Sequence, residues 1–141
     1  MSDTQTLEKV PNYAPAKGGA SVYLQLDGAL KAAHFYEKAF GAEMAALVPP
    51  DDKGRTMHIH LYLNGSTVML SDFYPEHGHA KESPAGFSVA LHVDDIDFWF
   101  KRAVDAGATV TQPVSVMFWG DRYGSVKDPW GVSWALNEAK K

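Results

Sequence analysis

A repeated pattern is the feature that most constrains how this chain can fold. Segments 21–27 and 88–94 both read Ser-Val-x-Leu-x-[Leu/Val]-Asp, and their starts lie 67 residues apart. Each segment is followed by apolar residues at helical spacing, and these stretches end at Gly41 and Gly107. Glycine suits the left-handed residue just past a helix end. Because these signals recur in the same order, we interpret the chain as two copies of one module.

Each copy also ends in two strand-like runs joined by a glycine turn, Asn64-Gly65 in the first and Trp130-Gly131 in the second. The alternation of apolar residues and these turns predict the order β-α-β-β-β for each copy. The predicted fold class is therefore α+β, with two tandem βαβββ modules. Strands are expected near residues 21–27, 43–48, 56–63, 66–72, 87–93, 109–114, 122–127 and 132–137, and helices near 29–40 and 95–106.

The modules define the expected domain organisation. We expect a flexible N-terminal lead over residues 1–19 and a single domain over 20–138. Within that domain, module one spans 20–73 and module two spans 87–138, and a linker rich in His, Pro and Gly joins them over 74–86. The helix of such a module covers one face of its sheet. The other face must meet the sister module, a second chain or a ligand.

The composition removes several classes of protein. The 141 residues include no Cys, which excludes a disulfide scaffold, a thiolate zinc site and a Cys nucleophile. The formal net charge of −4 gives no electrostatic footprint for a nucleic-acid partner. No apolar run approaches the roughly 20 residues that span a bilayer, and the polar N-terminus lacks a signal-peptide pattern. We expect a cytoplasmic protein with neither a nucleic acid nor a membrane as partner.

Alternation sorts the strand residues into two faces. One face is apolar, is expected to pack under the helices, and includes Met57 and Phe87. The opposite face mixes aromatic, hydrogen-bonding and small side chains without Lys, Glu or Asp in its middle. This mixture favours the lining of a small-molecule cavity over a partly wet core. The predicted ligand-binding residues on these faces are Tyr23, Gln25, His60, Tyr62, Met69, Ser71, Ser88 and His92.

Two residues near the end of the chain complete the predicted ligand-binding set. Arg122 shares strand parity with Gly124 and Val126, which an alignment of the two halves assigns to the cavity side. Its guanidinium could clamp a carboxylate or phosphate, or it could pair with an aspartate, for example Asp121 or Asp128, and only order the loop. Trp119 could stack on a ligand or pack against the fold.

Several motifs resemble those of one known family. They are Tyr23–Gly28, His34–Ala42, Met57-His58-Ile59-His60, Val68–Asp72, Phe118–Gly124 and Asp128-Pro129-Trp130-Gly131. They resemble the vicinal oxygen chelate superfamily, which includes glyoxalase I and bleomycin-resistance proteins, and more narrowly its PhnB-like branch. The resemblance implies a homodimer in which curved mixed sheets form an incomplete barrel around a small-molecule cavity.

The resemblance also locates a metal site that this chain does not fill. Metal-using members of the superfamily place His or Glu ligands on the first and last strands of each module. Those positions carry over to Ser21, Met69, Ser88 and Ala135. None of these residues is a His or a carboxylate. We therefore expect no metal cofactor.

His58 is the predicted catalytic residue, because it matches a histidine that recurs in the PhnB-like pattern. It could donate a hydrogen bond to a ligand or act as a general base. The sequence thus predicts a small-molecule-binding protein or an unassigned enzyme. The alternative is a metal-dependent lyase or dioxygenase with a relocated site at His58 and His60, completed by His92 or Tyr62. A dimer with a vestigial cavity is a third reading.

Overall fold

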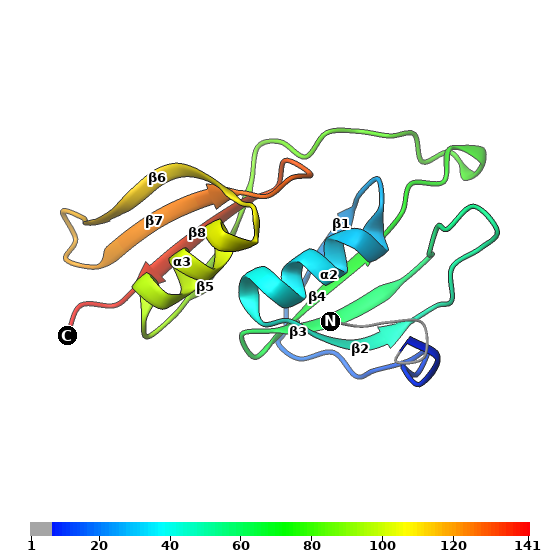
Figure 1. The fold of residues 1–141 in the computed structure, drawn as a ribbon, viewed down its shortest axis with the longest axis horizontal. Helices are drawn as coiled ribbons and strands as arrows, with labels where there is room; N and C mark the ends of the chain where they lie inside the picture. Colours follow the sequence, from blue (N-terminus) through cyan, green and yellow to red (C-terminus); the bar gives the residue numbers. More distant parts are fainter. Residues whose placement is uncertain (1–6) are drawn as a thin grey trace. The chain divides into compact units, whose positions relative to one another are not determined.

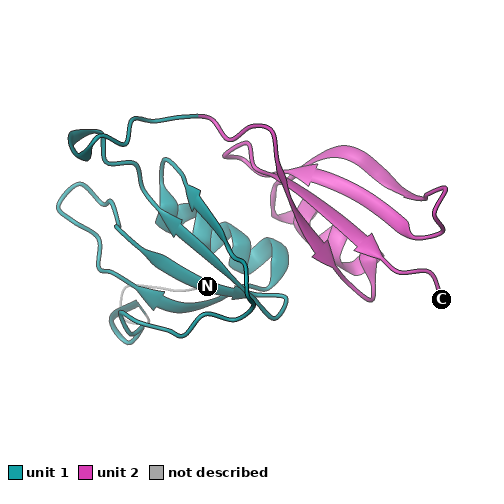
Figure 2. Cartoon of the chain, turned by 180° about the vertical axis from the view of Figure 1, so that it is seen from behind, with its two compact units in different colours: residues 1–82 teal, residues 83–141 magenta. Residues whose placement is uncertain are grey.

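The computed structural model describes residues 7–141, and these form two compact units, 7–82 and 83–141 (Figure 2). The boundary falls inside the predicted linker. The first unit contains β1 (Val22–Gln25), α2 (Ala29–Phe40), β2 (Glu43–Leu47), β3 (Ile59–Leu63), β4 (Ser66–Ser71) and the 3-10 helix η1 (Pro75–His77) (Figure 1). The second unit contains β5 (Ser88–His92), α3 (Ile96–Ala106), β6 (Thr109–Val116), β7 (Arg122–Lys127) and β8 (Ser133–Glu138).

The two units have the same sheet topology, which confirms the predicted pair of βαβββ modules. The strand orders are β1-β4-β3-β2 and β5-β8-β7-β6. In each sheet the first and last strands of the module pair in parallel, and the other pairs are antiparallel. Each sheet is an open one of four strands and does not close into a barrel by itself.

A buried carboxylate near the end of each module's last strand caps that module's helix. Asp72 Oδ1 accepts hydrogen bonds from Gly28 N at 2.9 Å and Ala29 N at 3.1 Å, at the start of α2. Glu138, 66 positions later, accepts one from Ile96 N at 2.9 Å, at the start of α3. A negative charge is favourable at a helix N-terminus, which has unpaired N–H groups. The repeat therefore includes the residues that position the helices.

The apolar faces pack under the helices, with two exceptions to the prediction. Leu24, Leu61 and Leu70 are buried on the α2 side of the first sheet. Met57, however, is 58% exposed and Phe87 is 44% exposed, so both are wrongly assigned to the core. The reason is the same for both residues. Each precedes the first paired residue of its strand, where alternation no longer determines which way a side chain points.

Candidate functional site

The candidate site lies on the face of the first sheet opposite α2, which we call the open face. Tyr23 on β1 is in register with Met69 on β4, and Met69 is in register with His60 on β3. Strands β1, β3 and β4 contain no Lys, Arg, Asp or Glu. Over these three strands the face is therefore uncharged and partly aromatic, as alternation predicts, and a charge enters only at the edge strand β2, where Glu43 lies opposite Tyr62.

Tyr23 and His58 form a hydrogen-bonded pair on the open face. The Tyr23 hydroxyl oxygen lies 3.1 Å from His58 Nδ1 and 3.3 Å from the carbonyl oxygen of Met57. The two rings are tilted, with their centroids 5.8 Å apart. Tyr23 is 46% exposed and His58 is half-buried, so both remain accessible within the unit.

Burial lowers the pKa of His58 from its ordinary value of 6.5, and the neighbouring His60 lowers it further by charge repulsion. Burial penalises the charged imidazolium. His58 is therefore neutral at neutral pH, so one ring nitrogen keeps a lone pair. A neutral imidazole can accept a hydrogen bond or a proton, as the predicted role requires.

His60 belongs to the open face as well but, in contrast to His58, is buried there. It is only 4% exposed, and its Nε2 lies 2.9 Å from Thr67 Oγ1. Its ring stands edge-on to Tyr62, with centroids 5.2 Å apart, and edge-on to His58 at 6.1 Å. Burial also lowers the pKa of His60. Over residues 7–141, no three His, Asp or Glu side chains cluster as metal ligands would.

Residues 11–17, which we call the N-terminal strap, cross part of the open face. The Pro11 carbonyl accepts a hydrogen bond from Leu47 N at 2.9 Å, at the edge of β2. The Tyr62 hydroxyl donates to the carbonyl of Pro15 at 2.7 Å. The backbone of the strap's last residue then bonds to Thr67 through both its N–H and its carbonyl. The strap thus occupies the Tyr62 and Thr67 end of the face.

The strap lies within the predicted lead of residues 1–19 and contacts the first sheet. Four hydrogen bonds attach it to the first sheet, and the Lys17 Nζ lies 4.0 Å from the centre of the Tyr62 ring. Pattern analysis missed this contact because the strap has neither helical spacing nor alternation. The strap leaves Tyr23, Gln25, His58 and Met69 as the accessible part of the open face, whereas Ser71 is buried.

Ser88 and His92 lie on β5 in the second unit, on the face opposite α3, and both are exposed. His92 lines a cleft of about 310 Å³ together with Asp94, Asn137 and Lys140. Trp119 lies in the turn between β6 and β7 and is 45% exposed. His92 therefore has more polar surroundings than the open face of the first sheet.

The assignment of Arg122 to the cavity side is wrong. Its guanidinium donates two hydrogen bonds of 2.9 Å to the Asp97 carboxylate on α3. This pairing raises the pKa of Arg122 and lowers that of Asp97. Gly124 does share a face with Arg122, but a side chain there would meet the ring of Phe100 on α3 at 3.0 Å. The shared face is therefore the helix-covered one.

The first unit also has a cleft, of about 400 Å³, and ion pairs of that unit line it. The Arg55 guanidinium donates two hydrogen bonds to the Glu76 carboxylate, at 2.7 and 3.0 Å, and one to the Asp51 carboxylate. The pairing with Arg55 lowers the pKa of Glu76 to about 2. Lys81 pairs with Asp27 at 3.1 Å. Since these charges are already matched with one another, the cleft offers less for a ligand than the open face does.

The fold and the sequence motifs agree with one family. The model of the Glyoxalase/Bleomycin resistance protein/Dioxygenase superfamily matches residues 22–136. The chain belongs to this superfamily. Protein Rv0887c of Mycobacterium tuberculosis is 39% identical over 98% of the chain and 80% of its own length.

Solved structures of similar proteins have the same two-module fold. The Pseudomonas aeruginosa protein PA1353 has a TM-score of 0.73 and 27% identity, over 88% of this chain and 99% of that one. A PhnB protein from Bacillus cereus has a TM-score of 0.66 and 22% identity, over 86% of this chain and all of that one. Over residues 7–141, no helix is long and apolar enough to cross a bilayer.

The residues at the superfamily's metal-ligand positions do not fit a divalent cation. Met69 lies opposite Tyr23 in the first sheet, and Ala135 lies opposite Ala90 in the second. A thioether and a methyl group cannot replace the imidazole and carboxylate ligands that such an ion prefers. The two serines predicted at the other positions add only neutral hydroxyls. We therefore derive no chemistry from a metal at these positions.

Proposed function

We propose that this superfamily member binds an uncharged small molecule of aromatic character on the open face of its first sheet, without a metal ion. The observation that carries the proposal is the Tyr23–His58 pair, hydrogen-bonded at 3.1 Å on the part of the face formed by β1, β4 and β3, three strands without a charged residue. A site with apolar walls and a few convergent polar groups is the usual form of a small-molecule site.

Each accessible residue of the face has a role in the proposal. The Tyr23 ring and the Met69 thioether supply apolar contact surface, since sulfur and aromatic rings pack favourably together. The Gln25 amide, exposed at the end of β1, supplies one donor and one acceptor. His58 supplies the directional hydrogen bond that orients the ligand.

Acid–base catalysis by His58 is a second candidate function. In enzymes, a base is commonly oriented by a hydrogen bond to its second ring nitrogen, as Tyr23 provides here. The relocated metal site with His60 has less support, because His60 Nε2 is already bonded to Thr67 and residues 7–141 contain no cluster of three ligands. The predicted homodimer stays a prediction.

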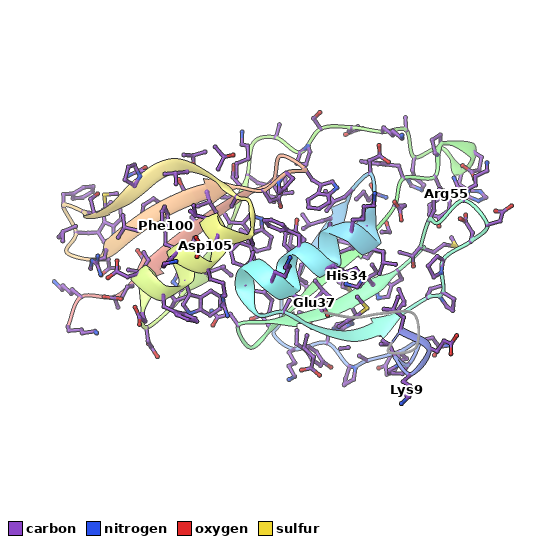
Figure 3. The ribbon with its side chains drawn as sticks, in the orientation of Figure 1. Lys9, His34, Glu37, Arg55, Phe100 and Asp105 are labelled. Carbon is purple, nitrogen blue, oxygen red and sulfur yellow. The ribbon has the colours of Figure 1, made fainter. Side chains whose placement is uncertain are left out.

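A thermal-shift screen of neutral aromatic fragments, in buffer with EDTA, tests the proposal. Three proteins are compared: the wild type, His58→Gln and His34→Gln. His34 is the matched control, because it lies on α2 and bonds to Glu37 at 2.8 Å, both labelled in Figure 3. We expect fragments that stabilise the wild type and His34→Gln and lose their effect on His58→Gln.

Two results would contradict the proposal. Fragments that stabilise all three proteins equally would bind elsewhere. Fragments that act only when a divalent metal is added would indicate a metal-dependent site. If fragments bind as expected, incubating them with wild type and His58→Gln and analysing the products by mass spectrometry then separates binding from catalysis.

A further inference from the structure

The Tyr23 hydroxyl has two hydrogen-bond neighbours but only one proton to give. It lies 3.3 Å from the Met57 carbonyl oxygen and 3.1 Å from His58 Nδ1. The carbonyl can only accept, whereas the histidine nitrogen accepts or donates depending on where the ring carries its proton. The positions of these two protons therefore depend on each other.

One arrangement satisfies both hydrogen bonds. In it, Tyr23 donates to the Met57 carbonyl and accepts from a protonated His58 Nδ1. In the other arrangement, Tyr23 donates to Nδ1 and the Met57 carbonyl loses its partner. Among the described residues, Tyr23 is the sole donor to that carbonyl. Because each net hydrogen bond is stabilising, the first arrangement is favoured.

The opposite ring nitrogen of His58 is then the one that meets a ligand. Among residues 7–141, no side chain or backbone group bonds to His58 Nε2. The first arrangement leaves this atom unprotonated, with its lone pair available. A carboxylate or phosphate oxygen there would set two acceptors against each other, whereas an O–H or N–H group would form a hydrogen bond.

This inference rests on the proposed function and specifies its ligand class. We infer that Tyr23 and Met57 hold His58 with its proton on Nδ1, so that the ligand of the open face is a neutral molecule presenting an O–H or N–H group to His58 Nε2. A phenol, an enol and an aromatic N–H compound all have this chemistry. Carboxylates, phosphates and molecules that only accept hydrogen bonds do not.

The first test needs no ligand. Long-range proton–nitrogen NMR spectra of the ¹⁵N-labelled protein at neutral pH distinguish a protonated ring nitrogen from an unprotonated one. The signals of His58 are identified by their absence from the spectrum of His58→Gln. We expect a protonated Nδ1 and an unprotonated Nε2. In Tyr23→Phe, which removes the acceptor of the Nδ1 proton, the share of Nε2–H should rise about fivefold.

The second test uses three probes of similar size, namely phenol, anisole and benzoate. Phenol can donate a hydrogen bond, anisole can only accept one, and benzoate carries a negative charge. In titrations followed by the NMR signals of His58 and Tyr23, anisole should bind about fivefold more weakly than phenol. Benzoate should bind more weakly still. The difference between phenol and anisole should shrink in His58→Gln.

The outcomes separate this inference from the proposed function. A protonated Nε2 in the free protein overturns the inference, whatever binds. Equal affinities for phenol and anisole overturn the ligand class, while the proposed function stands. If the Nδ1 proton is found but neither the probes nor any screened fragment shifts the His58 signals, the proposed function fails and takes the ligand class with it.

Discussion

Replacing Asp72 by Asn should destabilise the first unit by about 3 kcal/mol and weaken ligand binding at the open face. Asp72 is 5% exposed, and its carboxylate accepts hydrogen bonds from three backbone N–H groups. Its Oδ1 accepts from Gly28 N and Ala29 N, and its Oδ2 accepts from Thr56 N at 2.9 Å. Thr56 lies two residues before His58, so the same carboxylate holds both the start of α2 and the approach to the site.

The magnitude follows from what asparagine can replace. Its single oxygen can keep the two bonds to α2, but its NH₂ group then faces the Thr56 N–H, donor against donor. Losing one buried hydrogen bond to a charged group costs about 1.5–3 kcal/mol. Removing the negative charge from the helix N-terminus costs a further 0.3–1 kcal/mol, approximately. The sum is about 3 kcal/mol.

The assay must report on the first unit, because all four tryptophans lie between residues 99 and 134 in the second. Urea unfolding followed by NMR amide signals of β1, β3 and β4 meets this need. Glu138→Gln, followed by the amide signals of β5 and β8 in its own unit, is the matched control, since its bond to Ile96 N can pass to the glutamine oxygen. If Asp72→Asn destabilises the first unit no more than Glu138→Gln destabilises the second, the reasoning is refuted.

Three further predictions address the site and its surroundings. Because the pKa of His58 in the folded protein is lowered from 6.5, the unfolded chain takes up a proton at a higher pH than the folded one, so stability should be full above pH 6.5 and fall below it. Ligand affinity should fall as the pH drops through the lowered pKa. Urea and ligand titrations between about pH 5 and pH 8 check both. A profile unchanged in His58→Gln would contradict this. Arg122→Gln should leave phenol affinity in the NMR titration unchanged, because Arg122 pairs with the exposed Asp97 on α3, and a marked loss of affinity would restore its predicted role. Gly124→Ala should destabilise the second unit by about 1–3 kcal/mol in urea unfolding, because the new methyl group would lie 3.0 Å from the Phe100 ring and 3.1 Å from the carbonyl oxygen of Gln112. A neutral effect would show that these neighbours can move aside.

The sequence predicts the modules well because the repeat constrains all levels at once. Segments 21–27 and 88–94 mark the first strands, and the strand orders of the two units are identical. Alternation also groups residues correctly into faces wherever a strand is paired. Tyr23, Met69 and His60 share the open face because each lies within a ladder.

The errors arise where a pattern does not contain the needed information. Met57 lies before the first ladder pair, so parity could not place it. Parity did group Arg122 with Gly124 and Val126, but the alignment of the two halves assigned this group to the wrong face, although the apolar Val126, which is fully buried, indicates the helix-covered one. The strap contacts depend on hydrogen bonds between Pro15 and Tyr62, 47 positions apart, and no local pattern indicates them.

The most direct test of the central claim is an NMR titration of the ¹⁵N-labelled protein with phenol in the presence of EDTA. The account predicts saturable shifts at Tyr23, His58 and Met69, with Arg55 and His92 unmoved. Shifts centred on Arg55 or His92, which line the two charged clefts, or binding that vanishes with EDTA and returns with a divalent metal, would contradict it.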